Sequence, residues 1–385
     1  MSQVIIIYFG MRGNQLTIKN ELLSHFEYLH EHAEISWKEI NTTNYIKKVL
    51  KELEYDVHTF ENCTGLYADL GQGKPVVAVR ADIDALWQEV DGEYKANHSC
   101  GHDAHMSIVI GVAKLMKEQS FKGTLRLIFQ PAEEKGTGAL KMIEKGVVED
   151  VDYLYGIHLR PVQELPYGVA SPVIVHGAGC MIDGYIKGSD SHGARPHLTT
   201  NAVDVITSIN QQIKQINVNP QVPNSIKMTY INAGGDNRNI IPGNGHFGVD
   251  IRAQNNDILF EIQHKFFNIV EGVKQAMNAN IECEILSHMP AAILNEEAIS
   301  FASKGIKKVI GEGNLVNTLV TSGGDDFHFY TIKNPQLQAT MIGLGCDLAP
   351  GLHHPNMKFN LNSLETGTNI LVETVLATFA KFKNV

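Results

Sequence analysis

The residues best suited to chemistry lie in one short segment, Cys100-Gly101-His102-Asp103-Ala104-His105. A thiolate and an imidazole two residues apart, on a loop that leads into a predicted helix, can point into one space, and both are good ligands for a borderline metal. The same pair could instead form a cysteine nucleophile with a histidine partner. A bare Cys-x-His is also about as often a buried cysteine beside exposed histidines, so the segment alone leaves three interpretations open.

Four further clusters of metal-binding side-chain types occur along the chain. They are Asp82 with Asp84, Glu133 with Glu134, His158, and His353 with His354. Adjacent carboxylates such as Glu133 and Glu134 repel each other unless a cation is near or one points away. A lone glutamate pair at a helix start is more often explained by the helix dipole. All five clusters, however, lie near the ends of predicted strands or at a helix start, where open α/β sheets bind ligands, and together they favour a metal site over coincidence.

The pattern of apolar residues predicts the elements that carry these clusters. Helical spacing occurs over 20–30, 42–53 and 104–116, and short apolar runs lie at 76–79, 125–129 and 153–155. Strands that alternate with helices predict an α/β catalytic domain with a mostly parallel sheet flanked by helices. A strand at 337–343 and a helix at 364–379 return the chain to that domain.

From residue 179 onward the pattern differs. Strands are predicted at 181–186, 225–231, 246–252 and 281–286, with helices at about 203–216 and 257–277. This β-α-β-β-α-β order is that of a ferredoxin-like unit. We expect an inserted lid and dimerisation domain at 178–288, and a catalytic metal-binding domain formed by 1–177 and 289–385.

The composition excludes several classes of protein. With a net charge of -10, the chain of 385 residues has no surplus of Lys and Arg for a nucleic acid or an anionic membrane. Five scattered cysteines, an odd number, argue against a disulfide framework and favour a reducing cytoplasm. The apolar run at 4–9 is too short to span a bilayer and has no preceding basic stretch, so we expect a short strand or a start further upstream.

In combination, these motifs resemble those of the metal-dependent amidohydrolase family of hippurate hydrolases, N-acetyldiaminopimelate deacetylases and auxin-conjugate hydrolases. That family is related to aminoacylases and zinc carboxypeptidases. The resemblance runs from about residue 29 to the C-terminus. It rests on the segments R-A-D-I-D-A-L (80–86), C-G-H-D-A-H (100–105), Q-P-A-E-E (130–134), G-I-H-L-R-P (156–161), H-G-A-R-P-H (192–197), N-I-I-P (239–242), G-D-D-F (324–327) and L-H-H-P (352–355).

The resemblance implies two divalent metal ions per chain, which ligand softness permits to be zinc, manganese, cobalt or nickel. The implied ligands are Cys100, His102, Glu134, His158 and His353. We expect Cys100 between the ions, with His102 and His158 on one ion and Glu134 and His353 on the other.

The resemblance also implies an activity, the hydrolysis of the amide bond of an N-acyl amino acid or a related small peptide. Glu133 matches the general base, while Asp82 and Asp84 match an acidic pair expected to orient ligand imidazoles, with Asp84 the more important for rate. In the lid, His192, Asn239 and Arg252 match positions that hold the carbonyl oxygen or the carboxylate of the substrate.

Two positions depart from the family pattern. Trp87 stands where a proline is usual, which puts the wall of the substrate pocket in question, and Asp190-Ser191 replaces a glycine pair before His192. The resemblance further implies a homodimer formed through the lid, in which His192 reaches the partner's site. The β-prone run 228–231 would be an exposed edge without such pairing.

Overall fold

The computed structural model describes residues 18–382, so the strand expected at 4–9 lies outside the described residues. The chain forms two compact units. Of the described residues, the first unit contains 18–175, 293–320 and 329–382, and the second contains 176–292 and 321–328. The second unit therefore covers the expected insertion at 178–288, extends a few residues beyond it at both ends, and takes in a separate segment at 321–328.

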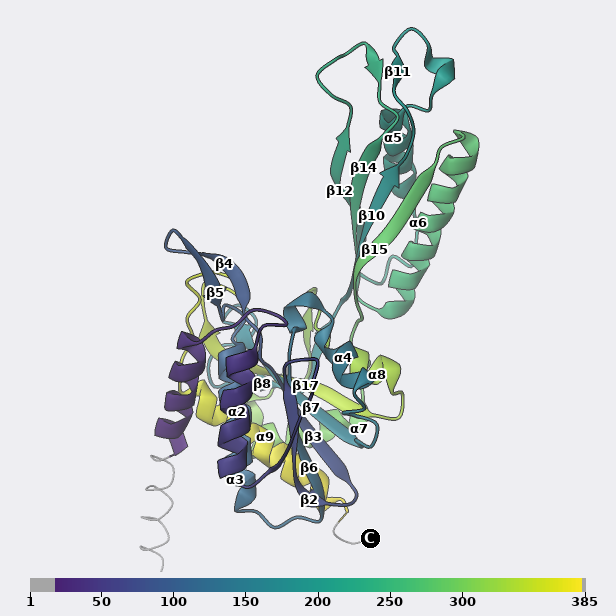
Figure 1. Ribbon diagram of the computed structural model, residues 1–385. Coiled ribbons are helices and arrows are strands. Elements are labelled where there is room, and N and C mark those ends of the chain that lie inside the picture. Colours follow the sequence, from purple (N-terminus) through teal and green to yellow (C-terminus); the bar gives the residue numbers. More distant parts are fainter. Residues whose placement is uncertain (1–17, 383–385) are drawn as a thin grey trace, which may run out of the picture. The chain divides into compact units, whose positions relative to one another are not determined.

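The first unit is built on a seven-stranded sheet (Figure 1). Its strand order is β1 (Asp56–Thr59), β2 (Leu66–Gln72), β6 (Gly123–Gln130), β3 (Val76–Asp82), β7 (Tyr153–Pro161), β17 (Gln338–Leu348) and β8 (Ala170–Ser171).

The sheet is mixed, and the expectation of a mostly parallel sheet was wrong, although the α/β class is confirmed. Strands β6, β3, β7 and β17 pair in parallel, whereas the pairs β1–β2, β2–β6 and β17–β8 are antiparallel. Antiparallel neighbours need only a short connection, such as the six residues between β1 and β2, whereas parallel neighbours need a crossover. The apolar pattern within a strand does not reveal which connection its neighbours use.

The helices of the first unit bury its sheet. A helix at 18–31 precedes α2 (Ile40–Glu52) and α3 (His102–Lys117), and the later helices are α4 (Gly138–Glu144), α7 (Glu296–Ile310), α8 (His328–Lys333) and α9 (Ser363–Ala380). Helix α3 is buried without interruption from His102 to Ala113 and packs on α9 and β3. A helix that is buried on all sides holds its first residues rigidly, and here those residues include His102. A hairpin of β4 (Leu86–Val90) and β5 (Glu93–Asn97) lies between β3 and α3 in the chain.

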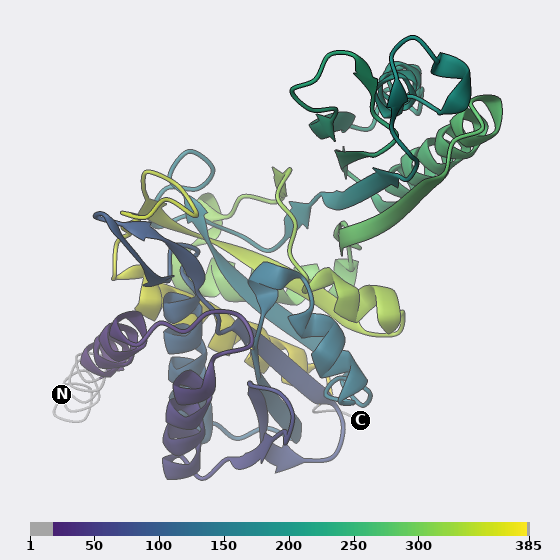
Figure 2. The same cartoon turned by 45° about the horizontal axis from the view of Figure 1, so that its top comes forward.

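The second unit has a four-stranded antiparallel sheet in the order β12 (Asn224–Ala233), β14 (Gly245–Ala253), β10 (Ala178–Ile186) and β15 (Ile281–Met289). Helices α5 (Ala202–Ile213) and α6 (Asn256–Ala276) pack against each other and against these strands (Figure 2). Alternate residues of β10, such as Ile182 and Ile186, join the helices in one apolar core. Within the described residues 18–382, no helix is long and apolar enough to cross a membrane.

Candidate metal centre

The predicted metal-binding clusters meet at one edge of the first unit's sheet. Strand β3 ends at Asp82, opposite Gln130 at the end of β6, and the chain after Gln130 carries Glu133 and Glu134. His158 lies in the second half of β7, the other parallel neighbour of β3. The parallel direction of these strands brings their carboxyl ends to the same edge.

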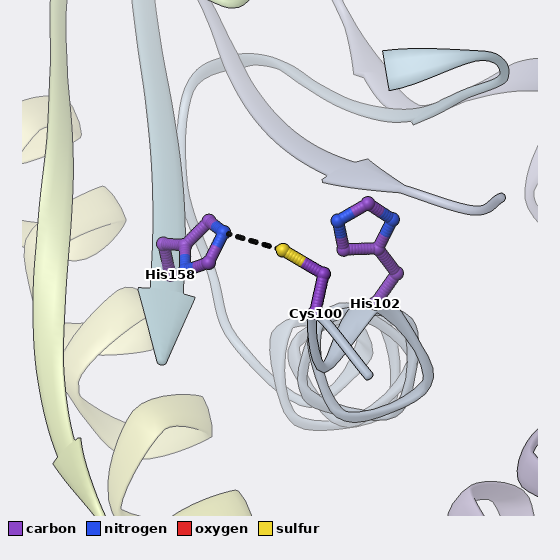
Figure 3. A group of neighbouring side chains, drawn as sticks. All are labelled: Cys100, His102 and His158. Atoms are coloured by element: carbon purple, nitrogen blue, oxygen red, sulfur yellow. Dashed lines mark hydrogen bonds between the residues drawn. The ribbon is translucent and has the colours of Figure 1, made fainter. Parts of the chain in front are cut away.

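Cys100, His102 and His158 form a first group of potential ligands (Figure 3). Their ligand atoms lie within 4.8 Å of one another, and all three residues are buried. The sulfur of Cys100 lies 3.6 Å from Nε2 of His158. A thiol and two imidazoles in a closed space are the donor set that a borderline divalent metal prefers.

The orientation of both imidazoles is fixed by backbone carbonyl groups. Nδ1 of His102 lies 2.8 Å from the carbonyl oxygen of Asp84, and Nδ1 of His158 lies 2.7 Å from that of Leu159. A ring nitrogen that donates its hydrogen to a carbonyl leaves the other nitrogen of a neutral ring with a free lone pair. In both residues that nitrogen is Nε2, the one available to a metal.

Cys100, Glu134 and His353 form a second group, again within 4.8 Å of one another. Oε1 of Glu134 lies 3.6 Å from Nε2 of His353. His353 lies on a loop, has a positive φ of 64° and keeps a half-exposed side chain. The two groups share the sulfur of Cys100.

Hydrogen bonds from neighbouring segments hold the loop of His353. The N–H of His353 donates to the carbonyl oxygen of Ser99, and Nε2 of Gln88 donates to the carbonyl oxygen of His353. Nδ2 of Asn97 donates both to Oε1 of Gln88 and to the carbonyl oxygen of Pro355. The β4–β5 hairpin therefore ties the loop of His353 to the segment that carries Cys100. No sequence motif indicated this role for Gln88 and Asn97.

Two buried polar atoms support a cation at this place. Among the described residues, Nε2 of His102 and Oε1 of Glu134 have no hydrogen-bond partner, and they lie 3.8 Å apart. Buried polar atoms normally have a partner, because an unpaired one loses its hydration without compensation. A metal ion would satisfy both atoms, and the thiol, imidazole and carboxylate donors nearby fit such an ion.

The electrostatics of the metal-free protein also favour positive charge here. Burial would lower the pKa of His102, but the carboxylate of Asp82 and other negative groups more than offset this and raise it. Burial raises the pKa of Glu134 to about 7, against the opposing effect of His102. Burial likewise raises the pKa of the Cys100 thiol, with a smaller contribution from Glu134. A cysteine nucleophile needs a lowered pKa, so this environment disfavours the Cys–His nucleophile interpretation.

His105 lies close to His102 and Asp82, and these three residues could also be considered as metal ligands. Both of its ring nitrogens are already bonded, however, since Nδ1 contacts a carboxylate oxygen of Asp82 at 2.7 Å and Nε2 accepts the N–H of Leu159 at 3.0 Å. Asp82 also pairs with Arg80 at 2.5 Å. His105 is therefore better suited to holding Asp82 and β7 in place than to binding an ion.

Asp84 contacts the glutamate pair more closely than expected. Its carboxylate oxygens accept the backbone N–H groups of Glu133 and Glu134, each at 3.1 Å, and the hydroxyl of Ser36 at 2.6 Å. The shorter contact between Asp84 and His102 joins the backbone carbonyl oxygen of Asp84 to Nδ1 of His102. The carboxylate of Asp84 lies 3.3 Å from the same nitrogen. Asp84 thus touches both the predicted base and a predicted ligand.

The three predicted lid residues belong to the second unit and are exposed. His192 is in β11 (Ser191–His192), which pairs with β13 (Ile240–Ile241), and the N–H of Gly193 donates to the carbonyl oxygen of Asn239. This pairing brings His192 and Asn239 onto adjacent segments. Arg252 lies in the four-stranded sheet, where its Nε donates to both carboxylate oxygens of Asp250 at 2.9 and 3.1 Å.

The two departures from the family pattern have different surroundings. Asp190 accepts the N–H of Gly243 at 2.9 Å, so this carboxylate helps to hold the segment that leads into His192. Trp87 is 61% exposed and lies on the hairpin next to Gln88, the residue that bonds to the His353 loop. Its exposure places it at a surface of the first unit.

Comparison with known proteins gives a consistent result. A family model described as "Peptidase family M20/M25/M40" matches residues 78–377. N-acetyl-L-cysteine deacetylase of Bacillus subtilis is 30% identical over 383 residues, which cover 94% of this chain and 89% of that protein. Hippurate hydrolase of Campylobacter jejuni is 32% identical over 322 residues, which cover 78% of this chain and 82% of that protein.

A solved structure shows the same fold. The crystal structure of a dinuclear metal-binding peptidase of the M20 family from Bacillus subtilis superposes with a TM-score of 0.80 at 24% identity. The superposition covers 94% of this chain and 99% of that one.

Proposed function

The chain belongs to peptidase family M20/M25/M40 and is a hydrolase of amide bonds, and we propose that its substrates are small N-acylated amino acids or related peptides. The comparisons with known proteins confirm the family and the reaction class that the sequence motifs predicted. Relatives named N-acetyl-L-cysteine deacetylase and hippurate hydrolase act on substrates of this kind, with an acyl group on an amino acid. A panel of N-acyl amino acids measures which acyl group and which amino acid this chain prefers.

One observation carries the proposal most strongly, namely that two groups of potential ligands share the sulfur of Cys100. We propose that two divalent ions bind here, one held by Cys100, His102 and His158 and the other by Cys100, Glu134 and His353. The thiol favours zinc, and manganese, cobalt or nickel would also suit the mixed donors. When bound, the metal pair lowers the pKa of a water molecule and polarises the substrate carbonyl.

Glu133 is proposed to be the general base. Its carboxylate oxygen Oε2 lies 4.0 Å from Nε2 of His102, at the edge of the proposed ligand set, and the residue is buried. In this position Glu133 can take a proton from the attacking water and deliver it to the leaving amine. Asp84 holds the N–H groups of Glu133 and Glu134 and so keeps the base and the ligand in a fixed relation.

The substrate carboxylate and the developing oxyanion are assigned to the second unit. We propose that His192 stabilises the negative charge on the carbonyl oxygen, and that Arg252 with Asn239 binds the carboxylate of the amino-acid half. Arg252 is half-exposed, and Asp250, its partner in the free protein, is the kind of group that a substrate carboxylate could replace.

We further propose that the second unit is a ferredoxin-like lid within a catalytic domain, and that it forms a homodimer. The chain order β10-α5-β12-β14-α6-β15 and the sheet order β12-β14-β10-β15 support this fold. Strand β12 is an edge strand whose Tyr230 and Ile231 are exposed, which supports pairing with a second copy. Five free cysteines support a reducing cytoplasm as the compartment.

A metal-removal experiment tests the proposed centre. Elemental analysis of the purified protein should find about two transition-metal ions per chain, and chelation should abolish hydrolysis of a panel of N-acetyl and N-benzoyl amino acids. Adding Mn²⁺, Co²⁺ or Zn²⁺ should restore it. Full activity in protein shown to be metal-free would rule the proposal out.

Adjacent histidines provide a matched control. His353→Ala should lower the bound metal, because it removes a ligand, whereas His354→Ala should leave metal content unchanged. The ring of His354 accepts the N–H of Asn356 at 3.1 Å and is not part of either ligand group. Equal metal loss in both variants would show that the loop, and not the imidazole of His353, holds the ion.

A further inference from the structure

The turn that carries Glu133 and Glu134 has an unusual backbone conformation at its first residue. Ala132 has φ 50° and ψ 41°, in the left-handed region that a residue with a Cβ adopts only when its surroundings impose it. The turn is closed on the far side, where the N–H of Gly138 donates to the carbonyl oxygen of Ala132 at 3.2 Å. A Cβ at Gly138 would lie 1.6 Å from the carbonyl oxygen of Pro131, so the backbone has no room to spread.

Three consecutive backbone N–H groups of this turn donate to two buried carboxylates. The N–H groups of Glu133 and Glu134 donate to Asp84, as described above. The N–H of Ala132 donates to Oε1 of Glu39 at 2.9 Å. Glu39 and Asp84 together therefore accept the N–H groups of residues 132 to 134, which include the proposed base Glu133.

Glu39 is fully buried, although it is 93 residues away from Ala132 in the chain. It directly precedes α2, yet its side chain does not cap that helix. Its second oxygen, Oε2, accepts the hydroxyl of Thr64 at 2.6 Å. A buried carboxylate is costly unless hydrogen bonds compensate for its lost hydration, and those bonds come here from Ala132 and Thr64.

We propose that Glu39 is a positioning residue for the hydrolysis, which holds Ala132 in its left-handed conformation and thereby fixes the direction from which the Glu133 side chain enters the site. The assignment rests on the proposed function, because it takes Glu133 as the base. Asp84 binds the N–H groups of residues 133 and 134, whereas the N–H of the preceding peptide, between Pro131 and Ala132, is bound by Glu39. Glu39 holds the N–H of that peptide, and Nε2 of Gln130 donates to its carbonyl oxygen at 3.4 Å.

Three variants separate this role from a simple contribution to stability. Glu39→Leu introduces an apolar side chain of similar size and removes both acceptor oxygens. Glu39→Gln keeps an amide oxygen that can accept the N–H of Ala132. Thr64→Val is the matched control, since it removes the other hydrogen bond of Glu39 and leaves the bond to Ala132 intact.

For a panel substrate, Glu39→Leu should lower kcat by about 10- to 100-fold, the range expected when a catalytic group is displaced by a fraction of an ångström to 1 Å. KM should change by less than about twofold, because Glu39 touches no substrate-binding residue. Metal content should stay at the wild-type value. Glu39→Gln and Thr64→Val should both keep most of the wild-type kcat.

Hydrogen exchange gives a measurement that does not depend on activity. The Ala132 amide should exchange faster in Glu39→Leu than in wild type, and at the wild-type rate in Thr64→Val. In the double variant Glu39→Leu/Ala132→Gly, part of the lost kcat should return, because glycine adopts a positive φ without strain.

The outcomes distinguish this inference from the proposed function. An inactive wild-type protein with two bound metals would contradict the proposed substrates, while the exchange rate of the Ala132 amide would still test Glu39. Unchanged kcat and unchanged exchange in a folded Glu39→Leu variant would overturn the positioning role. So would equal losses of kcat in Glu39→Leu, Glu39→Gln and Thr64→Val.

Discussion

The two units present their predicted functional residues in different ways. In the first unit, Cys100, His102 and His158 are buried, and backbone carbonyls fix both imidazoles. In the second unit, His192 and Arg252 are exposed. The buried set is held in place by the chain itself, whereas we expect the exposed set to reach its functional geometry only with a substrate or another surface.

Residues with equally clear sequence motifs can therefore be held in place in very different ways. A change in the buried set should alter metal binding or the chemical step within one chain. A change in the exposed set should alter steps that need a second component. The following experiments test that contrast.

The largest effect is expected within the glutamate pair. Glu133→Gln should keep both metals yet lower kcat by about two to four orders of magnitude, the range for a lost general base. Glu134→Gln should lower metal content as well, because it removes a ligand oxygen. Steady-state kinetics combined with elemental analysis separates the two. If the two variants exchange these behaviours, the assignment within the pair is reversed.

A somewhat smaller loss is expected for His192. His192→Ala should lower kcat by about 100-fold, as for a lost oxyanion donor. Mixing it with Glu133→Gln should restore activity if His192 acts in the partner's site. Random mixing makes about half of the dimers hybrid, and each hybrid has one intact site of two, so roughly a quarter of wild-type activity should return.

Native mass spectrometry provides the control for that mixing experiment, since it shows whether hybrids formed. Hybrids without recovered activity would mean that His192 acts within its own chain or not at all. That result would also remove the main difference proposed here between the two units.

A moderate effect is expected from acid on the first unit. His98 is buried with no hydrogen-bond partner at either ring nitrogen among the described residues, and burial lowers its pKa to about 4. The unfolded chain has an ordinary histidine pKa near 6.5, so between pH 6.5 and 4 it binds more protons than the folded protein. The contribution of His98 to the stability should therefore be full above pH 6.5 and be lost as the pH drops toward 4, by up to about 3 kcal/mol.

Denaturant unfolding of chelator-treated protein at several pH values measures this effect. Both tryptophans, Trp37 and Trp87, belong to the first unit, so their fluorescence reports its unfolding alone. His98→Asn should flatten the pH dependence by about one proton. An unchanged slope in that variant would assign the acid sensitivity to another group.

The smallest effect is expected from a matched pair of helix caps. Asn295 caps α7 in the first unit and Asn255 caps α6 in the second, and each side chain accepts a backbone N–H at 2.9 Å. Replacing either by alanine should cost about 1 kcal/mol. If the units unfold separately, only Asn295→Ala should shift the tryptophan transition, and an equal shift for Asn255→Ala would show that they unfold together.

The sequence was sufficient to predict most helices and strands of both units. Apolar runs at 76–79, 125–129 and 153–155 lie in β3, β6 and β7, and the helix predicted at 104–116 is α3. These elements stand out as nearly continuous apolar runs because they are buried on all sides. The direction of strand pairing was not predictable in this way, since it depends on how β2 and β8 are connected.

The candidate site shows the same limit. Cys100 and His102 stand out because they are close in sequence and of metal-binding type. Glu39 gave no signal, because its bond to Ala132 joins distant segments and a lone glutamate before a helix is common. The hydrogen bonds of Gln88 and Asn97 to the loop of His353 were not predicted either, because they also join segments that are distant in the sequence.

The single sulfur shared by the two ligand groups has a consequence for metal uptake. If each ion had its own complete set of ligands, the two would bind independently, and a one-metal form would accumulate during titration. With Cys100 common to both, binding of the first ion would favour the deprotonated form of the Cys100 thiol, which the second ion also needs. Uptake in the proposed centre should then be cooperative, and a single oxidation of Cys100 would remove a ligand from both ions at once.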